Sequence, residues 1–452
     1  MSKKIIIAAA FALALSACKK EKDDVSTPPL VVGQEIKDEN LKGTVKGTML
    51  TGKTYYLDGE VFVNEGDTLL MQPGVKLLAK TDKTALIVHG TFISLGTEEQ
   101  RNVISSVNAP ASRRNVPNGD FDTDPAMKGL WGGIIGSTTC KNIIFKWTSL
   151  EYTGSLFDEM PIPGLSGNKY YWTITFFNPN GNLILEDCHF YGCYTEGIRI
   201  HGGNVCIMRN KFEKMGLLVG DALKLRNDTK GDVAYNLFVG CANYCLTVDA
   251  PASTVRQAEA NIYNNTFVNS GWRTERPSKH AIWIGQDGRG KIYNNVIVNC
   301  MGGLHFNNDP KPDLANVVYG NNYFYADTKE VAEVFYPSIG CAEPQNTDIP
   351  YLKNYITGDW TQGIEYDGTA LVGLNKPAFV NFTIPCSNPK EYDFTGGLDF
   401  DITASSPLVG KGKTDFTPFK MVKVDPNFGA TEITGPGKDL GAYQKDGSGL
   451  KF

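Results

Sequence analysis

Asn264-Asn265-Thr266-Phe267 is one of five similar tetrapeptides that recur along this chain. The others are Arg209-Asn210-Lys211-Phe212, Tyr235-Asn236-Leu237-Phe238, Asn294-Asn295-Val296-Ile297 and Asn321-Asn322-Tyr323-Phe324. Counted from Phe190, their last residues follow at intervals of 22, 26, 29, 30 and 27 residues. Repeats of this size, built from short apolar runs with Gly, Asn and Asp between them, predict a solenoid of β-strands.

Two columns appear when these repeats are aligned. The asparagines from Asn210 to Asn322 form one column, and stacked coils would give their amides hydrogen-bond partners from one coil to the next. The second column lies three positions after each apolar anchor and contains Cys193, Met215, Cys241, Ser270, Cys300 and Asp327. Most of the cysteines therefore fit small, packed core residues, and no ligand spacing typical of zinc is present.

The asparagine column and the stacked interior resemble the right-handed parallel β-helix proteins, the pectate-lyase-like fold. The segments 55–75, 85–90 and 131–135 look like the opening coils of Bacteroidetes β-helix lipoproteins, and 406–412 and 439–443 look like their closing segment. The resemblance spans most of residues 54–443. It implies an all-β parallel β-helix over residues 45–330, with terminal coils and an irregular C-terminal cap over residues 331–452. It implies little about activity, because this fold carries lyases, hydrolases, binding proteins and structural spikes.

The N-terminus has the order of an export signal. Lys3 and Lys4 precede an apolar run, and Leu15-Ser16-Ala17-Cys18 is similar to the bacterial lipobox. We expect residues 1–17 to be a lipoprotein signal peptide, Cys18 to carry lipid including palmitate, and residues 18–44 to form a flexible tether. The apolar run is too short to span a bilayer. The expected location is the outer membrane, lipid-anchored at the cell surface, with its periplasmic face as the alternative.

The charge of the chain argues against a nucleic-acid partner. It is −5 for the whole sequence and becomes −7 once Lys3 and Lys4 leave with the signal peptide. Cys341 and Cys386 lie outside the regular repeats, and in an exported protein they are candidates for a disulfide.

One strand of each repeat aligns without gaps and predicts a ligand-binding surface. Its segments are Gly197–His201, Ala222–Arg226, Cys245–Asp249, Ala281–Gly285 and Gly303–Asn307. Strand alternation sends the Ile, Leu, Val and Phe side chains inward and the residues between them outward. The outward columns contain Arg199, Lys224, Thr247, Trp283 and His305, beside His201, Arg226, Asp249, Gly285 and Asn307. Thr175 and Phe177 extend these columns by one coil.

Such a surface suits a polysaccharide. Arg, Lys and His side chains bind carboxylate or sulfate groups, Trp283 offers a ring face, and Asp249 offers an acceptor or a base. Trp272, in the loop before the Trp283 strand, is a candidate rim contact. The leading hypothesis is therefore a surface lipoprotein that binds polysaccharide, including an acidic one, through Arg199, His201, Lys224, Arg226, Asp249, Trp283, His305 and Trp272. A mixed polar sheet with no ligand is the alternative interpretation.

Two other functions stay open from the sequence. A polysaccharide lyase or glycoside hydrolase would use Lys224, Arg199 or Asp249 as catalytic residues, and a lysine base would require a lowered pKa. A structural or adhesive surface protein would need no site at all. No cofactor is expected, although the carboxylates of Asp120, Asp122 and Asp124 leave a calcium loop open; Pro125 and Trp131 exclude an EF-hand.

Overall fold

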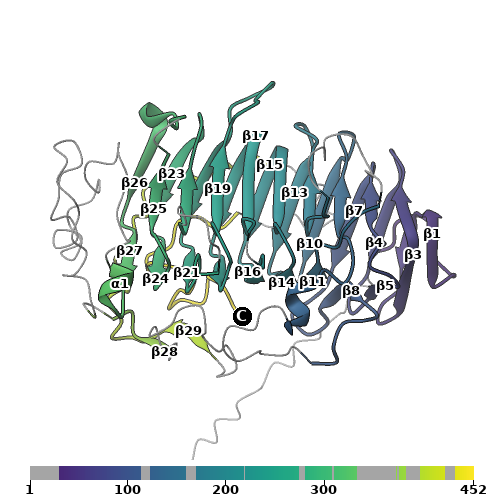
Figure 1. The fold of residues 1–452 in the computed structure, drawn as a ribbon, viewed down its shortest axis with the longest axis horizontal. Helices are drawn as coiled ribbons and strands as arrows, with labels where there is room; N and C mark the ends of the chain where they lie inside the picture. The colour runs from purple at the N-terminus through teal and green to yellow at the C-terminus, as the bar shows by residue number, and fades with distance from the viewer. Residues whose placement is uncertain are drawn as a thin grey trace, which may run out of the picture.

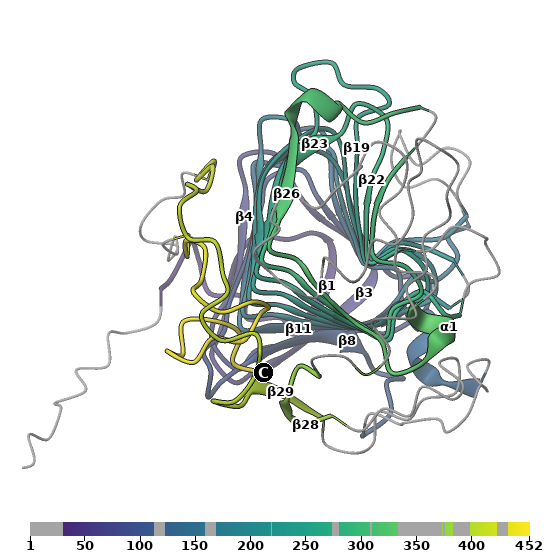
Figure 2. The same cartoon turned by 90° about the vertical axis from the view of Figure 1, so that its left-hand side faces the viewer.

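Short strands stack into a three-sided solenoid. The computed structural model describes residues 30–112, 123–158, 169–217, 219–273, 280–307, 310–332, 373, 376–382, 398–422 and 433–452. Twenty-seven strands form one continuous system in which each pairs in parallel with its equivalent on the next coil. Figure 1 shows these coils side by side along the long axis, and Figure 2 shows that each coil has three sides. The architecture is a parallel β-helix, which confirms the expected fold class.

The three sides are called sheets 1, 2 and 3. Sheet 1 contains the second half of β3 (Thr54–Val63), then β6 (Leu86–Val88), β9 (Ile134–Gly136), β12 (Ile174–Phe176), the first halves of β15 (Ile198–Met208) and β17 (Leu223–Ala234), β19 (Leu246–Asp249), β22 (Ile282–Ile284) and β25 (Leu304–Phe306). Sheet 2 contains β2 (Gly47–Met49), β4 (Thr68–Met71), β7 (Thr91–Leu95), β10 (Asn142–Lys146), β13 (Asn182–Glu186), the second halves of β15 and β17, β20 (Glu259–Tyr263), β23 (Arg289–Tyr293) and β26 (Val317–Gly320). Sheet 3 contains the first half of β3, β5 (Lys76–Ala79), β8 (Asn102–Ser106), β11 (Thr148–Thr153), β14 (His189–Cys193), β16 (Lys211–Met215), β18 (Leu237–Val239), β21 (Thr266–Val268), β24 (Val296–Val298) and β27 (Tyr323–Tyr325).

The folded coils begin inside the segment that the sequence analysis assigned to the tether. Strand β1 (Asn40–Thr44) already pairs in parallel with β3, and Leu41 is buried. The folded part therefore starts before residue 45. One buried leucine among Asn, Lys, Gly and Thr gives too weak an alternation to be recognised as a strand from sequence.

The predicted asparagine column is a continuous buried ladder. The side-chain amide of Asn210 donates to Oδ1 of Asn236 at 2.9 Å, and Asn236 donates to Asn265 in the same way. The series continues through Asn295 to Asn322, again at 2.9 Å. Each Oδ1 also accepts the backbone N–H of the preceding asparagine, so the amides are bonded on both sides. Beside the ladder, the rings of Phe190, Phe212, Phe238 and Phe267 stack with centroids 4.6 to 4.9 Å apart.

The residue before each ladder position turns the chain from sheet 2 to sheet 3. It adopts a left-handed conformation on every coil from β10 onward, although none of these residues is glycine. They are Trp147, Asp187, Arg209, Tyr235, Asn264, Asn294 and Asn321, with φ between 49° and 61°. Asparagine and aspartate tolerate this conformation better than other side chains do, which explains why three of the motif copies begin with two asparagines.

Part of the segment predicted to form terminal coils and a C-terminal cap lies along the side of the β-helix. Its described residues, 411–422 and 433–452, are called the return segment, and they run back outside the coils over the corner between sheets 2 and 3. Asn321 donates to the carbonyl of Lys411, Asn294 to that of Lys413, and Asn264 to that of Asp439. Figure 2 shows this yellow segment outside the coils, and Figure 1 shows it near the coils of β16 to β24. Asparagine side chains at the corner therefore hold the return segment.

The remaining elements are short. They are η2 (Pro125–Met127), η3 (Leu314–Asn316), α1 (Lys329–Ala332) and the antiparallel pair β28 (Phe379–Asn381) and β29 (Asp399–Ile402). None of the helices in the described ranges is long and apolar enough to cross a membrane.

Replacement of Asn265 by alanine tests the ladder. We expect Asn265→Ala to lower the free energy of unfolding by about 2–4 kcal/mol, because it leaves buried donors and acceptors of two neighbouring coils unpaired. Urea denaturation followed by circular dichroism measures the change. Asn204→Ala is the matched control, since its half-buried amide donates to Asn182 on the outside of sheet 2; it should cost under about 1 kcal/mol. Equal losses in the two variants would contradict the role given to the ladder.

Candidate functional site

The outward column predicted from the sequence is present in the predicted register. Thr175 of β12 pairs with Arg199 of β15, and Arg199 pairs with Lys224 of β17. Lys224 pairs with Thr247 of β19, and the column continues through Trp283 to His305 of β25. The alternating inward residues are almost completely buried. Sheet 1 thus presents equivalent outward positions on six consecutive coils.

Two further columns flank this one, and the three together are called the outer face. The first flanking column lies three residues before the outward position and contains Trp172, Glu196, Asp221, Tyr244 and His280. Its register is confirmed by backbone bonds such as Gly197 N–H to Asp221 O and Ala222 N–H to Tyr244 O. The other flanking column lies two residues after the outward position and contains Phe177, His201, Arg226, Asp249, Gly285 and Asn307. The constant spacing of three residues, as in Glu196 and Arg199, would have revealed the first flanking column from the sequence.

Charged side chains in the middle of the outer face are paired with one another. The Nε of Arg226 donates to Oδ1 of Asp249 at 2.8 Å across neighbouring coils. The ammonium of Lys224 lies 3.4 Å from a carboxylate oxygen of Asp221 and 4.0 Å from one of Asp249. Thr247 donates to the same Asp221 carboxylate at 2.9 Å. Both aspartates are buried, so these charges form a sheltered, oriented network rather than an exposed basic patch.

Arg199 forms the next part of this network toward the N-terminal coils. Its guanidinium donates to Glu196 at 2.7 Å and lies 4.5 Å from the ring centre of Trp172. A cation over an indole face is attracted by the ring's electron density. The imidazole of His201 stacks on Phe177 with a centroid distance of 4.7 Å. Aromatic rings from the β12 coil therefore close one end of the outer face.

A second aromatic group closes the other end. The indole of Trp283 lies against the backbone of Gly285, where an added Cβ would come within 1.9 Å of the ring. Glycine is required there by this close approach. Tyr244 packs beside the indole at 5.6 Å between ring centres, and His280 stacks on His305 at 4.1 Å. Trp283 and His305 remain partly accessible to solvent.

The histidines of the outer face are uncharged at neutral pH. Burial, together with the positive charges of Arg199, Arg226 and Lys224, lowers the pKa of His201 to about 3. Burial also lowers the pKa of His305 to about 4, and burial and the neighbouring His305 lower that of His280 well below its usual value. Each of these imidazoles can donate or accept one hydrogen bond without contributing charge.

Comparison with known proteins agrees with this geometry. Residues 165–322 match the family model described as a right handed beta helix region, which spans the coils of the outer face. The fold is a right-handed parallel β-helix. No curated protein and no solved structure matches the chain.

The structure corrects one of the predicted ligand contacts. Trp272, expected at the rim, is 5% exposed, and its indole N–H donates to the carbonyl of Asn299 at 2.8 Å. Its neighbour Arg273 is also buried and donates to backbone carbonyls, including that of Gly216. Both side chains fasten the loop to the coils and cannot reach a ligand. The sequence around them is polar enough to look exposed, and only the coil stacking reveals the buried carbonyls that they satisfy.

The catalytic candidates are all engaged in ion pairs. Lys224 lies between two carboxylates, Arg199 is held by Glu196, and Asp249 accepts from Arg226. The ammonium of Lys224 lies beside Asp221 and Asp249, and Asp249 also pairs with the neighbouring Arg226. The geometry therefore gives no support to a proton-abstracting lysine at this position.

The residues predicted to carry lipid, to form a disulfide or to bind calcium lie outside the described residues or already have protein partners. Cys18, Asp120, Asp122, Cys341 and Cys386 lie outside the described ranges. The carboxylate of Asp124 accepts the backbone N–H of Ala126 and pairs with Lys214 at 2.6 Å, so a lysine ammonium takes the place of a cation there. Within the described ranges, no three His, Cys, Asp or Glu side chains are grouped to hold a metal ion.

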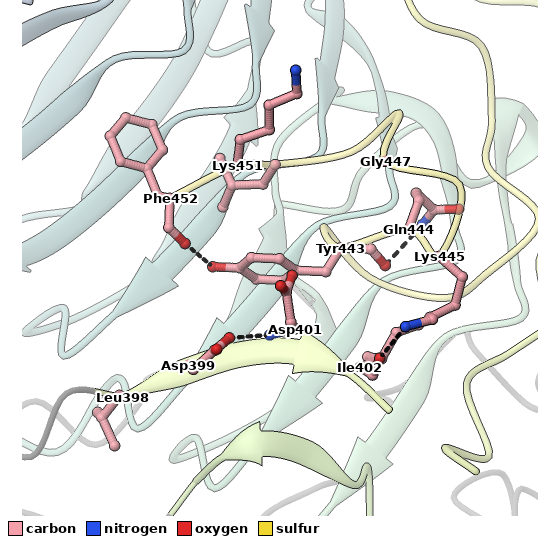
Figure 3. Close-up of a pocket in the computed structure, with 11 residues that line it drawn as sticks. Leu398, Asp399, Asp401, Ile402, Tyr443, Gln444, Lys445, Gly447, Lys451 and Phe452 are labelled. Atoms are coloured by element: carbon pink, nitrogen blue, oxygen red, sulfur yellow. Dashed lines mark hydrogen bonds between the residues drawn. The ribbon is translucent and has the colours of Figure 1, made fainter. Parts of the chain in front are cut away.

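A cavity of about 640 Å³ lies away from the outer face, between β29 and the last residues of the return segment. Figure 3 shows the groups that line it. Asp399 accepts the backbone N–H of Asp401, Tyr443 donates to the carbonyl of Phe452, and Lys445 donates to a carbonyl of β29. The bond of Lys445 joins the return segment to β29, and the other two lie within one segment each, so the polar groups are used to hold the local structure and the outer face remains the candidate site.

The lowered histidine pKa values predict a pH dependence of stability. Histidines of the unfolded chain titrate near 6.5, whereas folding holds His201, His280 and His305 in the neutral form. The contribution of these histidines to the free energy of unfolding is therefore complete above about pH 6.5. It is lost progressively as the pH falls from there toward 4. Urea midpoints measured between about pH 7.5 and pH 5 should decrease, and less steeply in His201→Phe, which keeps the ring stack. Parallel pH profiles for the two proteins would refute this assignment.

Proposed function

We propose that this β-helix binds a polysaccharide along the outer face of sheet 1. The proposal rests on the order of side-chain types along the six coils of the outer face. Aromatic side chains lie at both ends, and a network of oriented hydrogen-bonding groups lies between them. Coils repeat every 4.8 Å or so, which makes the face about 20–25 Å long and suited to an extended chain molecule. The proposal rests on these side chains, because the fold itself is compatible with many functions.

The indole of Trp283 supports a sugar ligand in particular. An indole already packed against Gly285 loses little conformational freedom when a sugar ring packs on it. Aromatic side chains supply large contact areas, and they commonly dominate binding energies. The strands of sheet 1 position this ring relative to Arg226 and Lys224.

Replacement of Trp283 tests the binding proposal. We expect Trp283→Ala to weaken glycan binding by about tenfold or more, since it removes the principal stacking surface. Titration calorimetry of the full-length protein with oligosaccharides that it retains on an array measures the change. Tyr56→Ala is the matched control, because Tyr56 is a half-buried aromatic residue on β3, far from the outer face. Unchanged affinity in Trp283→Ala would reject the site, and release of new chain ends would show an enzyme instead.

We also propose that the protein is an exported lipoprotein of the outer membrane, with the β-helix held at the cell surface. The support is the sequence pattern around Cys18 and the charged stretch that follows it. A surface β-helix with a long glycan-binding face would retain polymeric glycan beside the cell, so location and proposed ligand are consistent.

Metabolic labelling with an alkyne-tagged palmitate tests the anchor. The wild-type protein should incorporate the label and sediment with membranes. Cys18→Ser should lose both properties, because no thiol remains to accept the lipid. Protease treatment of intact cells then distinguishes the outer surface, where the β-helix is accessible, from the periplasmic face. Full labelling of Cys18→Ser would contradict the assignment.

A further inference from the structure

The charges on the outer face cancel one another. Among its described residues, the cations are Arg199, Lys224 and Arg226, and the carboxylates are Glu196, Asp221 and Asp249. Each cation lies within 4.0 Å of at least one of these carboxylates. The histidines of the face are neutral for the reasons given above. A surface with three positive and three negative charges attracts neither anions nor cations over a distance.

An acidic ligand would meet repulsion at close range as well. A carboxylate or sulfate that approached Arg226 would come close to Asp249, which bonds to Arg226 at 2.8 Å. Displacing Asp249 from this contact would leave a buried carboxylate unpaired, which is costly. The same holds at Lys224, which lies beside Asp221 and Asp249. In the sequence these carboxylates stand at constant spacings from the basic column, but their ion pairs with it are seen only in the folded structure.

Paired charges of this kind are well suited to neutral hydroxyl groups. A guanidinium keeps further N–H donors when one of them is used in an ion pair, and a carboxylate keeps further lone pairs. Hydrogen bonds from a hydroxyl to an ionised partner are stronger than those between neutral groups. The network thus supplies fixed donors and acceptors side by side, and a hydroxyl group can use both.

Polar atoms without partners occur on the same coils. Thr175 is 1% exposed, and its Oγ1 has no hydrogen-bond partner among the described residues. Nε of Arg199 and Nε2 of His201, on the adjacent coil, are also buried without a partner there. Buried polar atoms are nearly always hydrogen-bonded in folded proteins. Three such atoms on neighbouring coils indicate a place where ligand hydroxyls complete the hydrogen bonding.

The spacing along the coils sets the size of the ligand. Arg226 and Trp283 lie two coils apart, which is about 10 Å, and Thr175 lies two coils beyond Arg226 on the other side. A single sugar cannot reach the indole and these polar atoms together. We propose, resting on the proposed polysaccharide function, that the outer face takes a neutral oligosaccharide chain whose hydroxyls bond to the paired charges while a sugar ring stacks on Trp283.

Binding to two matched oligosaccharide panels tests this inference. The first contains neutral gluco-, manno- and xylo-oligosaccharides of increasing length, and the second contains oligogalacturonates and sulfated heparin fragments. With the full-length protein, we expect neutral chains to bind, with an affinity that increases with length. The affinity for neutral chains should change less than about twofold between roughly 0.05 and 0.5 M salt, because no net charge is neutralised on binding.

Asp249→Asn separates the two ligand classes further. Loss of the carboxylate should weaken neutral-chain binding by about tenfold, and would instead strengthen an acidic ligand by releasing Arg226 and Lys224. Glu259→Gln is the matched control, because Glu259 pairs with Lys230 and Arg289 in sheet 2, outside this face. Thermal unfolding establishes that each variant is folded, and Trp283→Ala replaces Asp249→Asn if that variant is not.

The outcomes distinguish this inference from the function on which it rests. Binding of neutral chains with little dependence on salt supports both the proposed function and the neutral ligand. Binding of oligogalacturonate or heparin fragments that weakens as salt increases overturns the neutral ligand and leaves polysaccharide binding in place. Absence of binding in both panels overturns the proposed function together with the inference.

Discussion

The stacking of one coil on the next is the constraint from which the rest of this molecule follows. Inside each coil, an asparagine must be hydrogen-bonded because it is buried, and it bonds both to the equivalent amide one coil away and to backbone groups of the adjacent coils. This requirement fixes the register of neighbouring coils to the residue. A one-residue slip would place a ladder amide against an apolar neighbour and turn inward side chains outward. The same register brings Arg226 beside Asp249 and Thr175 beside Arg199, so the outer face inherits its geometry from the ladder.

Much of this arrangement could be predicted from the sequence because it is periodic. The ladder, the phenylalanine stack and the outward column from Arg199 to His305 all depend on the spacing of equivalent residues, and spacing is visible in a sequence. The interactions between columns were much harder to predict. Asp221 was overlooked because it precedes its strand, and its contact with Lys224 depends on the direction in which the chain enters the coil. Trp272 was misplaced for a related reason, since its partner carbonyl on Asn299 belongs to the next coil.

The outer face carries ionised side chains without presenting a surface of one charge sign. Its cations and carboxylates are interleaved on adjacent coils, so each charge orients its neighbour and little net field extends into solvent. The aromatic rings at both ends, Trp172 with Phe177 and Trp283 with Tyr244, mark the limits of this network. A rigid scaffold suits such an arrangement, because the ligand does not have to organise the donors and acceptors when it binds.

The return segment changes how the coils depend on one another. In a simple solenoid each coil contacts only its neighbours, so one end can fray while the other stays folded. Here residues 411–422 and 433–452 bind at the corners of coils that include Asn321, Asn264 and Tyr235, and Phe452 reaches the ring of His189. Unfolding of one coil therefore removes contacts of the return segment, which also binds to distant coils. The return segment connects coils that do not contact one another directly. The free energy of unfolding of the β-helix therefore depends on these C-terminal contacts as well as on the contacts between neighbouring coils.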